Sequence, residues 1–269
     1  MSAVEILAIQ MLIFWARHSI LAGIVGLVSL TGRALGISHR IQAQQASKEI
    51  VFREILWSVS AGVILVLAMD LVLEAAERGY TRVYFDVSSR GLPWFFTSIG
   101  CALILHDAYF YWTHRLMHDW KALRQFHGLH HRFTNPTSWS AFSFHPVETL
   151  IATGILPLVA WTIPIHPLAF FCFTTLMTAQ SVMLHCGSEL TPSARRGFAS
   201  GIWMRSRSHN DHHRGARGNY GLYLTLWDIA MGTLVTRSLE STAPGQKLAL
   251  EPGVTSDAPT DHQREVARL

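Results

Sequence analysis

One apolar run limits what this chain can fold into. Residues 55–73, ILWSVSAGVILVLAMDLVL, contain a single acid, Asp70. A helix of that length reaches about 28 Å, close to the hydrocarbon thickness of a bilayer. Residues 93–112 begin similarly, and residues 147–186 form a longer apolar stretch that prolines interrupt. A single run could be a buried core helix. Several such apolar runs in a chain with only 15% charged residues predict an integral membrane protein.

These runs predict an all-α fold, a membrane helical bundle of about four transmembrane helices. We expect one helix over about 55–74, a second from residue 93, and a hairpin of 147–163 and 168–186. Residues 4–30 leave two possibilities open, because Arg17 and His18 interrupt them. Either one helix spans with these two side chains facing the bundle, or two short pieces lie against the interface.

Histidines are the second constraining feature. They gather in two stretches, 106–131 and SHNDHH. Within them the histidines form three packets, each a set at helical spacing. Positions i, i+3 and i+4 share one face of a helix, so the rings of each packet project together. A lone buried histidine is usually structural, but eight at this spacing suit metal, which neutral imidazole binds. Eight exceed the four ligands of one tetrahedral ion and are about right for two ions. The packets are His114 and His118; His127, His130 and His131; and His209, His212 and His213.

The packets are expected at one membrane surface. Tyr109, Tyr111 and Trp112 precede the first packet as an interfacial aromatic belt would. The hairpin returns the chain to the same side, where a histidine-rich helical cap would form. Basic residues are more numerous there than in the opposite loop, 75–92. The positive-inside rule therefore predicts a cytoplasmic site on a multi-pass inner or plasma membrane protein.

Other features narrow the function classes. Cys101, Cys172 and Cys186 lack CxxC spacing, so we expect neither a disulfide framework nor a thiolate metal site. The net charge of +4 comes from residues that flank membrane segments and does not indicate nucleic-acid binding. No cleavable signal peptide is expected. The expected organisation is N-terminal membrane helices over 1–92, a histidine-box domain over 93–237 and a flexible tail over 238–269.

Five segments together resemble a known family. HDAYFYWTHRLMH, HGLHH, FHPVE, SHNDHH and NYGLYLTLWDIAMGT are similar, in this order, to the fatty acid hydroxylase / sterol desaturase superfamily, over about 97–235. The resemblance implies a four-helix membrane base with a cytoplasmic histidine cap. It also implies a di-iron centre that uses O2 to hydroxylate or desaturate a lipid.

The resemblance also assigns residues. It adds His185 in VMLHCGSEL to the eight histidines, giving nine metal ligands, and no catalytic residue beyond them. Some relatives have another histidine one turn earlier, where this chain has Ser181. The NYG segment is expected to form a turn that anchors the cap.

Four residues are candidates for supporting roles. His106 is left open as a ligand, a hydrogen-bond partner of a ligand or a packing residue. Asp107 and Asp211 suit orientation of an imidazole through its other nitrogen, although Asp211 is equally well read as a solvated loop acid. His145 is expected to shape the edge of the site.

The implied chemistry requires partners. Two iron ions, with zinc as a substitute, would act on a lipid together with O2. A separate donor, a ferredoxin or a cytochrome b5 with its reductase, would supply electrons, because the sequence has no GxGxxG after a strand and no iron–sulfur spacing. Aromatic residues beside the boxes are candidate walls of a lipid tunnel: Trp112, Phe126, Trp139, Phe142 and Phe144.

Three alternatives remain open. A carotenoid hydroxylase also uses histidine boxes. A zinc-dependent membrane hydrolase would need a general base, and no HExxH occurs. A non-enzymatic metal carrier or sensor would bind the same ions without turnover, although a transporter should carry ionisable residues at the bilayer midplane.

Overall fold

The computed structural model describes residues 2–42, 44–190, 201–215 and 217–235. Residues up to Leu234 form one compact unit, and the predicted tail, 238–269, lies outside the described residues. The fold is helical, as predicted, with two short strands in the described part. Its helices are α1 (Ala3–Ala34), α2 (Lys48–Glu77), η1 (Val87–Ser89), α3 (Gly91–Asp119), α4 (Lys121–His131), η2 (Ser138–Phe142), α5 (Pro146–Thr153), α6 (Ile155–Thr162), α7 (Pro167–Leu184), α9 (Ser206–Gly215) and α10 (Leu226–Ala230); its strands are β1 (His39–Arg40) and β2 (Ser188–Glu189).

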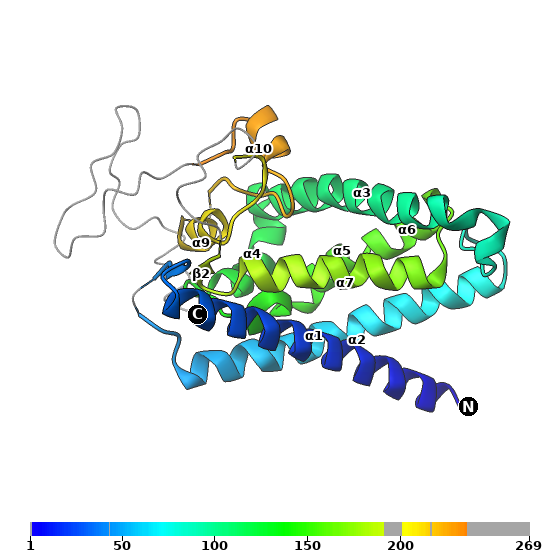
Figure 1. Ribbon diagram of the computed structural model, residues 1–269, viewed down its shortest axis with the longest axis horizontal. Coiled ribbons are helices and arrows are strands. Elements are labelled where there is room, and N and C mark those ends of the chain that lie inside the picture. Colours follow the sequence, from blue (N-terminus) through cyan, green and yellow to red (C-terminus); the bar gives the residue numbers. More distant parts are fainter. Residues whose placement is uncertain (1, 43, 191–200, 216, 236–269) are drawn as a thin grey trace. The chain divides into compact units, whose positions relative to one another are not determined.

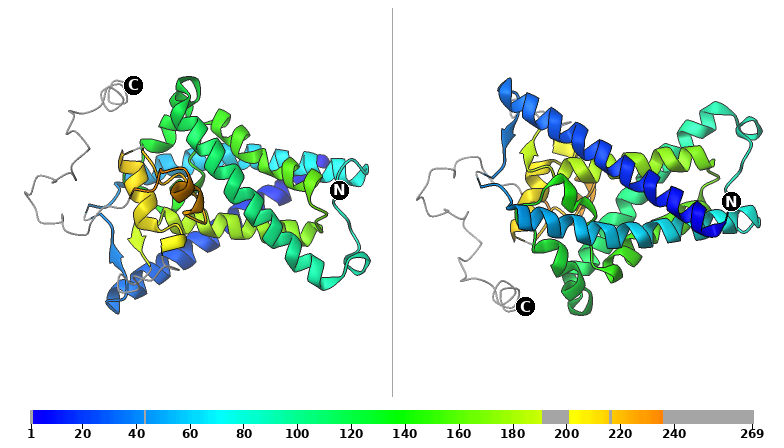
Figure 2. Two further views of the ribbon diagram at one scale, coloured as in Figure 1. Left: turned by 90° about the horizontal axis from the view of Figure 1, so that it is seen from above. Right: turned by 90° about the horizontal axis from the view of Figure 1, so that it is seen from below.

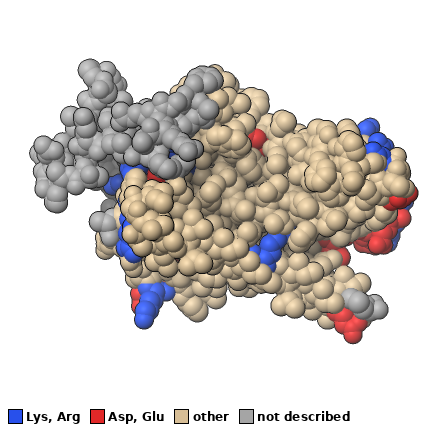
Figure 3. Space-filling view, viewed as in Figure 1, with Lys and Arg blue, Asp and Glu red and all other residues tan. Residues whose placement is uncertain are grey.

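Three helices are long and apolar enough to cross a membrane. They are Val4–Ala34, Lys48–Glu77 and Pro167–Leu184, with mean hydropathies of 1.7, 2.2 and 1.4. The segment Pro146–Thr162 is apolar but shorter. These helices agree with an integral membrane protein, and the number of about four spans stays a prediction. Figure 3 fits this picture, since charged side chains gather mainly toward the two ends of the visible face and the surface between them is mostly uncharged.

The long helices α1, α2, α3 and α7 run along the length of the bundle (Figure 1). α1 packs against α2 and α7, and α3 packs against α7. The N-terminus lies at the end of the bundle away from α9 and α10 (Figure 1). The views in Figure 2 agree that α4, α9 and α10 gather at the other end. β1 pairs antiparallel with β2 and so joins the end of α1 to the end of α7.

α1 resolves the alternative left open by the sequence. It is one helix of 32 residues, begun by a capping box between Ser2 and Glu5. Both interrupting residues contact the bundle. The Arg17 Nη1 donates to Thr174 Oγ1 at 2.9 Å, and His18 is fully buried.

The first arm of the predicted hairpin is bent rather than straight. α5 ends at Thr153 and α6 begins at Ile155. At this bend the Tyr109 hydroxyl donates to the Ile151 carbonyl at 2.5 Å. A Cβ on Gly154 would overlap the same hydroxyl oxygen, so a larger residue here would displace the Tyr109 side chain. The second arm, α7, starts with the His166 side chain accepting from the Leu168 N–H at 3.1 Å.

Candidate metal centre

A break between two helices brings the first histidines together. α3 ends at Asp119, where Trp120 adopts an extended conformation, and α4 begins at the next residue. The Arg124 side chain donates to the His118 carbonyl at 2.7 Å and holds the corner. The His114 and His118 face of α3 therefore meets the histidine face of α4.

The remaining histidines come from α7 and α9. His185 follows the last residue of α7 as its C-cap. α9 is held beside it, because the Ser206 hydroxyl donates to the Met183 carbonyl at 2.7 Å and Glu189 accepts from the Arg207 N–H at 3.3 Å. The buried face of α9 carries its three histidines. Four helices thus contribute rings to one place.

The nine predicted ligands converge as two groups. Within each group the nitrogens lie within 4.8 Å of one another, and every ring is buried. The groups are His114, His118, His127, His131 and His212; and His130, His185, His209 and His213. The structure therefore brings together every histidine singled out as a ligand.

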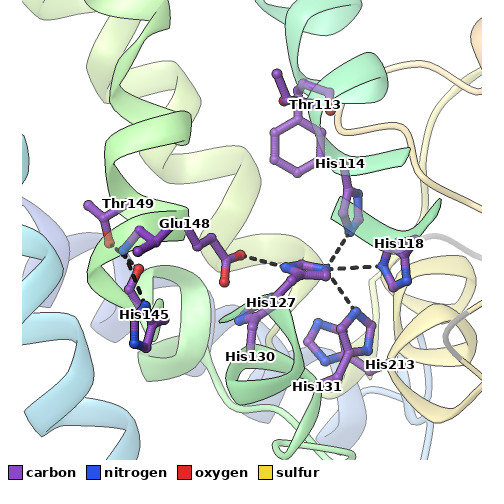
Figure 4. A network of polar contacts seen from close by, with 12 residues as sticks. Thr113, His114, His118, His127, His130, His131, His145, Glu148, Thr149 and His213 are labelled. Atoms are coloured by element: carbon purple, nitrogen blue, oxygen red, sulfur yellow. Dashed lines mark hydrogen bonds and ion pairs between the residues drawn. The ribbon is translucent and has the colours of Figure 1, made fainter. Parts of the chain in front are cut away.

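The nitrogen separations in the first group do not fit hydrogen bonding. His127 Nε2 lies 3.1 Å from His114 Nε2, 3.0 Å from His118 Nε2 and 3.0 Å from His131 Nε2 (Figure 4). One imidazole nitrogen either donates one proton or accepts at one lone pair, so it cannot bond all three. Two nitrogens about 2.1 Å from one ion and at right angles to each other would be about 3.0 Å apart. The spacing fits ligands of a shared ion.

The second group repeats this pattern. His185 Nε2 lies 3.0 Å from His209 Nε2, 3.2 Å from His213 Nε2 and 3.3 Å from His130 Nε2. His213 and His209 are 3.2 Å apart through the same atoms. Neither group contains a carboxylate or thiolate among the described residues. Two all-nitrogen donor sets of this kind suit divalent transition metals.

Burial prepares these rings to bind metal. It is the largest cause lowering the pKa of His127, His130, His212 and His213 well below the usual value, and neighbouring histidines lower each further. The rings are therefore neutral at pH 7, which leaves a lone pair available for an ion.

Acceptors behind the rings fix which nitrogen faces the centre. His114 Nδ1 lies 2.9 Å from the Tyr220 carbonyl, and His212 Nδ1 lies 2.7 Å from the Gly218 carbonyl. His185 Nδ1 is 2.7 Å from the Ser181 carbonyl. Since a carbonyl only accepts, each Nδ1 carries the proton and each Nε2 lone pair points inward.

The predicted NYG turn supplies the Tyr220 carbonyl, and Gly218 directly precedes the turn. Asp228 holds it by accepting from the N–H groups of Tyr220 and Gly221, each at 2.9 Å. Asn219 has φ 54°, the left-handed conformation that asparagine tolerates. A Cβ on Gly221 would lie 2.5 Å from the Leu224 carbonyl oxygen, so the turn requires glycine there. The turn thus positions ligands as well as anchoring the cap.

Glu148 is a functional candidate that the sequence reasoning did not single out. Its Oε1 accepts from His127 Nδ1 at 2.7 Å, and both side chains are 3% exposed. His127 is the ring whose Nε2 lies closest to three others, so Glu148 acts on the centre of the first group (Figure 4). The FHPVE segment contains the residue, but its partner is 21 positions away and is identified only by the fold.

The four residues assigned supporting roles lie around the site. His106 Nδ1 pairs with the Tyr223 hydroxyl at 2.9 Å, and Asp107 accepts from the N–H of the same residue at 3.1 Å. His145 Nδ1 accepts from the Val147 N–H at 3.2 Å as the N-cap of α5. Asp211 is half-buried on α9. These contacts place His106 and Asp107 against the chain that follows the NYG turn.

A largely apolar cavity lies against the histidines. It encloses about 880 Å³, its open part included, and His114, His127, His130, His185 and His209 line it together with apolar side chains of α2, α3, η2, α5, α6 and α7. Its mostly apolar lining would suit the hydrocarbon part of a lipid.

Two of the five predicted tunnel walls, Phe142 and Phe144, line this cavity. The other three pack elsewhere. The Trp112 ring lies 5.8 Å from that of Trp227, Phe126 lies 4.7 Å from His145, and Trp139 lies 5.5 Å from His18. Proximity to a histidine box in sequence therefore does not identify a wall.

Sequence comparison gives an independent assignment. Lathosterol oxidase from Mus musculus is 29% identical over 193 residues, which are 70% of this chain and 61% of that protein. The Homo sapiens lathosterol oxidase is 30% identical over 70% of this chain and 62% of its own length. A methylsterol monooxygenase of Aspergillus fumigatus is 33% identical over 49% of this chain and 44% of that protein.

The chain thus spans about three fifths of the lathosterol oxidases that it matches. No solved structure matches it. The sequence profile described as fatty acid hydroxylase matches residues 99–233, which are half of the chain. This range contains all nine converging histidines. The chain belongs to the fatty acid hydroxylase family.

Proposed function

We propose that this protein is an O2-dependent di-iron membrane oxidoreductase that hydroxylates or desaturates a lipid. The observation that carries the proposal is the pair of histidine groups beside a largely apolar cavity. The relatives named as a lathosterol oxidase and a methylsterol monooxygenase favour a sterol or another rigid lipid as substrate.

The nine histidines would hold the two ions, five around one and four around the other. Iron would supply the oxidation of an unactivated C–H bond by O2, which side chains alone cannot perform. The chain's own contribution is to keep the rings neutral, to direct their Nε2 lone pairs inward, and to hold the tautomers through Glu148 and the carbonyls of Tyr220 and Gly218.

The cavity would bind and orient the substrate. Phe110, Phe142, Phe144, Leu156 and Met177 line it and would exclude water from the reacting carbon. A hydroxyl group on the lipid would find few polar partners among these walls, so shape would dominate positioning. Electrons would come from a separate ferredoxin, or from cytochrome b5 with its reductase, on the cytoplasmic side.

The test is turnover by the purified protein in lipid nanodiscs with iron, a reconstituted donor chain and candidate sterols or fatty acyl lipids. Mass spectrometry should show a product that gains oxygen or loses two hydrogens, and only in air. A cleaved, hydrolysed product formed equally under argon would support the zinc hydrolase alternative instead. Lipid profiles of a deletion strain would identify the substrate class.

A further inference from the structure

A second cavity lies within the membrane part of the bundle, among α1, α2 and α7. It encloses about 750 Å³, its open part included. Most of its lining is apolar, and the polar lining residues are Gln10, Arg17 and Thr174. Leu65 lines both this cavity and the one beside the histidines, so a side chain separates the two. None of the nine ligand histidines lines the second cavity.

Arg17 makes this cavity unusual. It lies near the middle of α1, a helix long and apolar enough to span a membrane. Its Nη1 donates to Thr174 Oγ1 at 2.9 Å, whereas its buried Nε has no hydrogen-bond partner. Within the described ranges no carboxylate forms an ion pair with Arg17. Asp70, the acid on the neighbouring stretch of α2, accepts from Gln10 at 3.0 Å.

The surroundings attract a positive charge without neutralising it. The guanidinium carbon lies 5.5 Å from the Phe171 ring centroid and 5.9 Å from that of Phe14, which gives cation–π attraction. A charged side chain at membrane depth is costly, and such residues normally pair or mark a ligand path. The group that best satisfies the free N–H donors of a guanidinium is a carboxylate, which accepts two of them at once.

We propose that the second cavity binds a long-chain fatty acid, with its carboxylate on Arg17 and Thr174 and its acyl chain along the apolar lining. Ile13 and Phe171, both partly exposed lining residues, leave the cavity open toward the side of α1 and α7, which would face lipid. A fatty acid could therefore enter from the bilayer. The proposal is independent of the reaction at the histidines, because it requires neither metal nor turnover.

The test compares oleate with oleyl alcohol, which has the same chain and no charge. Equilibrium binding of each radiolabelled probe to the full-length protein in detergent micelles should show at least tenfold preference for oleate. Arg17→Met should remove that preference, while Arg17→Lys should keep part of it. Ala152→Phe, which narrows only the cavity beside the histidines, should leave it intact. Metal content of each variant reports whether the histidine end is folded.

A second measurement covers the case in which Arg17→Met does not fold. A photoactivatable fatty acid on the wild-type protein should label peptides of α1 and α7 around Arg17 and Thr174, and excess oleate should compete. Equal binding of oleate and oleyl alcohol would overturn the proposal. So would an unchanged preference in Arg17→Met, or labelling confined to α3 and α5.

Discussion

The contact between Glu148 and His127 allows the sharpest single-residue test. Replacing Glu148 by glutamine keeps the shape and one acceptor oxygen but exchanges the ionisable carboxyl for a neutral amide. The bond is 2.7 Å long and both partners are 3% exposed, so water cannot substitute for the carboxylate. Loss of a partner behind a metal-bound histidine typically lowers metal affinity about 10- to 100-fold, or about 1.4–2.7 kcal/mol. Glu148→Ala, which also removes the acceptor, should lie at the upper end of that range.

The assay is competitive chelator titration followed by metal analysis. Glu148→Gln should release metal from the five-histidine group first, because His127 belongs to that group. Glu54→Gln is the matched control. Glu54 is also fully buried but accepts from the Thr137 N–H at 3.2 Å and contacts no ligand histidine. If both glutamine variants lose metal equally, or neither does, then Glu148 has no specific role at the centre.

Three further predictions follow from the geometry. His130→Ala and His212→Ala remove ligands from different groups, so each should lower the iron content by about one ion per chain and abolish turnover; full iron and activity in either would contradict the assignment. Gly154→Ala puts a Cβ 2.3 Å from the Tyr109 hydroxyl oxygen, whereas a Cβ at Gly100 meets nothing within 4 Å; only the former should destabilise, by about 1–3 kcal/mol in thermal or denaturant unfolding. Acid should unfold the metal-free protein, because burial lowers the pKa of His127, His130, His209, His212 and His213. As pH falls through about 6.5, histidines of the unfolded chain bind protons, whereas the buried rings of the folded chain stay neutral. The free energy of unfolding therefore falls by about 2 kcal/mol between pH 7 and pH 5 for each ring that stays neutral. A melting temperature independent of pH over this range would refute this prediction.

The helical spacing of the histidines, together with their number, predicted that they form a shared metal site. Positions i, i+3 and i+4 place rings on one face whatever the rest of the chain does, and all eight such histidines lie in the two groups. His185 has no partner at that spacing, so only the family resemblance identified it. It joins the second group because α7 ends beside α9, a tertiary relation that local spacing does not contain.

The acceptors behind the rings were harder to predict. Asp107 and Asp211 were candidates because acids often orient metal-bound histidines. Asp107 accepts from backbone N–H groups after the NYG turn. The carbonyls of Tyr220 and Gly218 orient His114 and His212. Every residue has a carbonyl, so no residue type marks this role in a sequence. The roles of His106 and Asp211, and the domain boundaries, stay predictions.

In the membrane helices, too, the sequence predicted the elements but not the contacts between them. Hydropathy predicted α2 and the hairpin. The bend at Gly154 lies one turn before Pro157, which cannot donate to the carbonyl of Thr153, and the contact of Tyr109 with this bend depends on the packing of another helix. The sequence marked Arg17 as an interruption of an apolar run. Its unpartnered Nε and the cavity around it depend on the packing of α1 against α7.

Two ions held by nine imidazoles are the central claim, and metal analysis combined with X-ray absorption of the purified protein tests it most directly. The account predicts two iron ions per chain, each surrounded mainly by imidazole nitrogens at about 2.0–2.2 Å, with a scattering contribution from the second ion. One ion or none per chain, or a spectrum dominated by sulfur or carboxylate ligands, would contradict it.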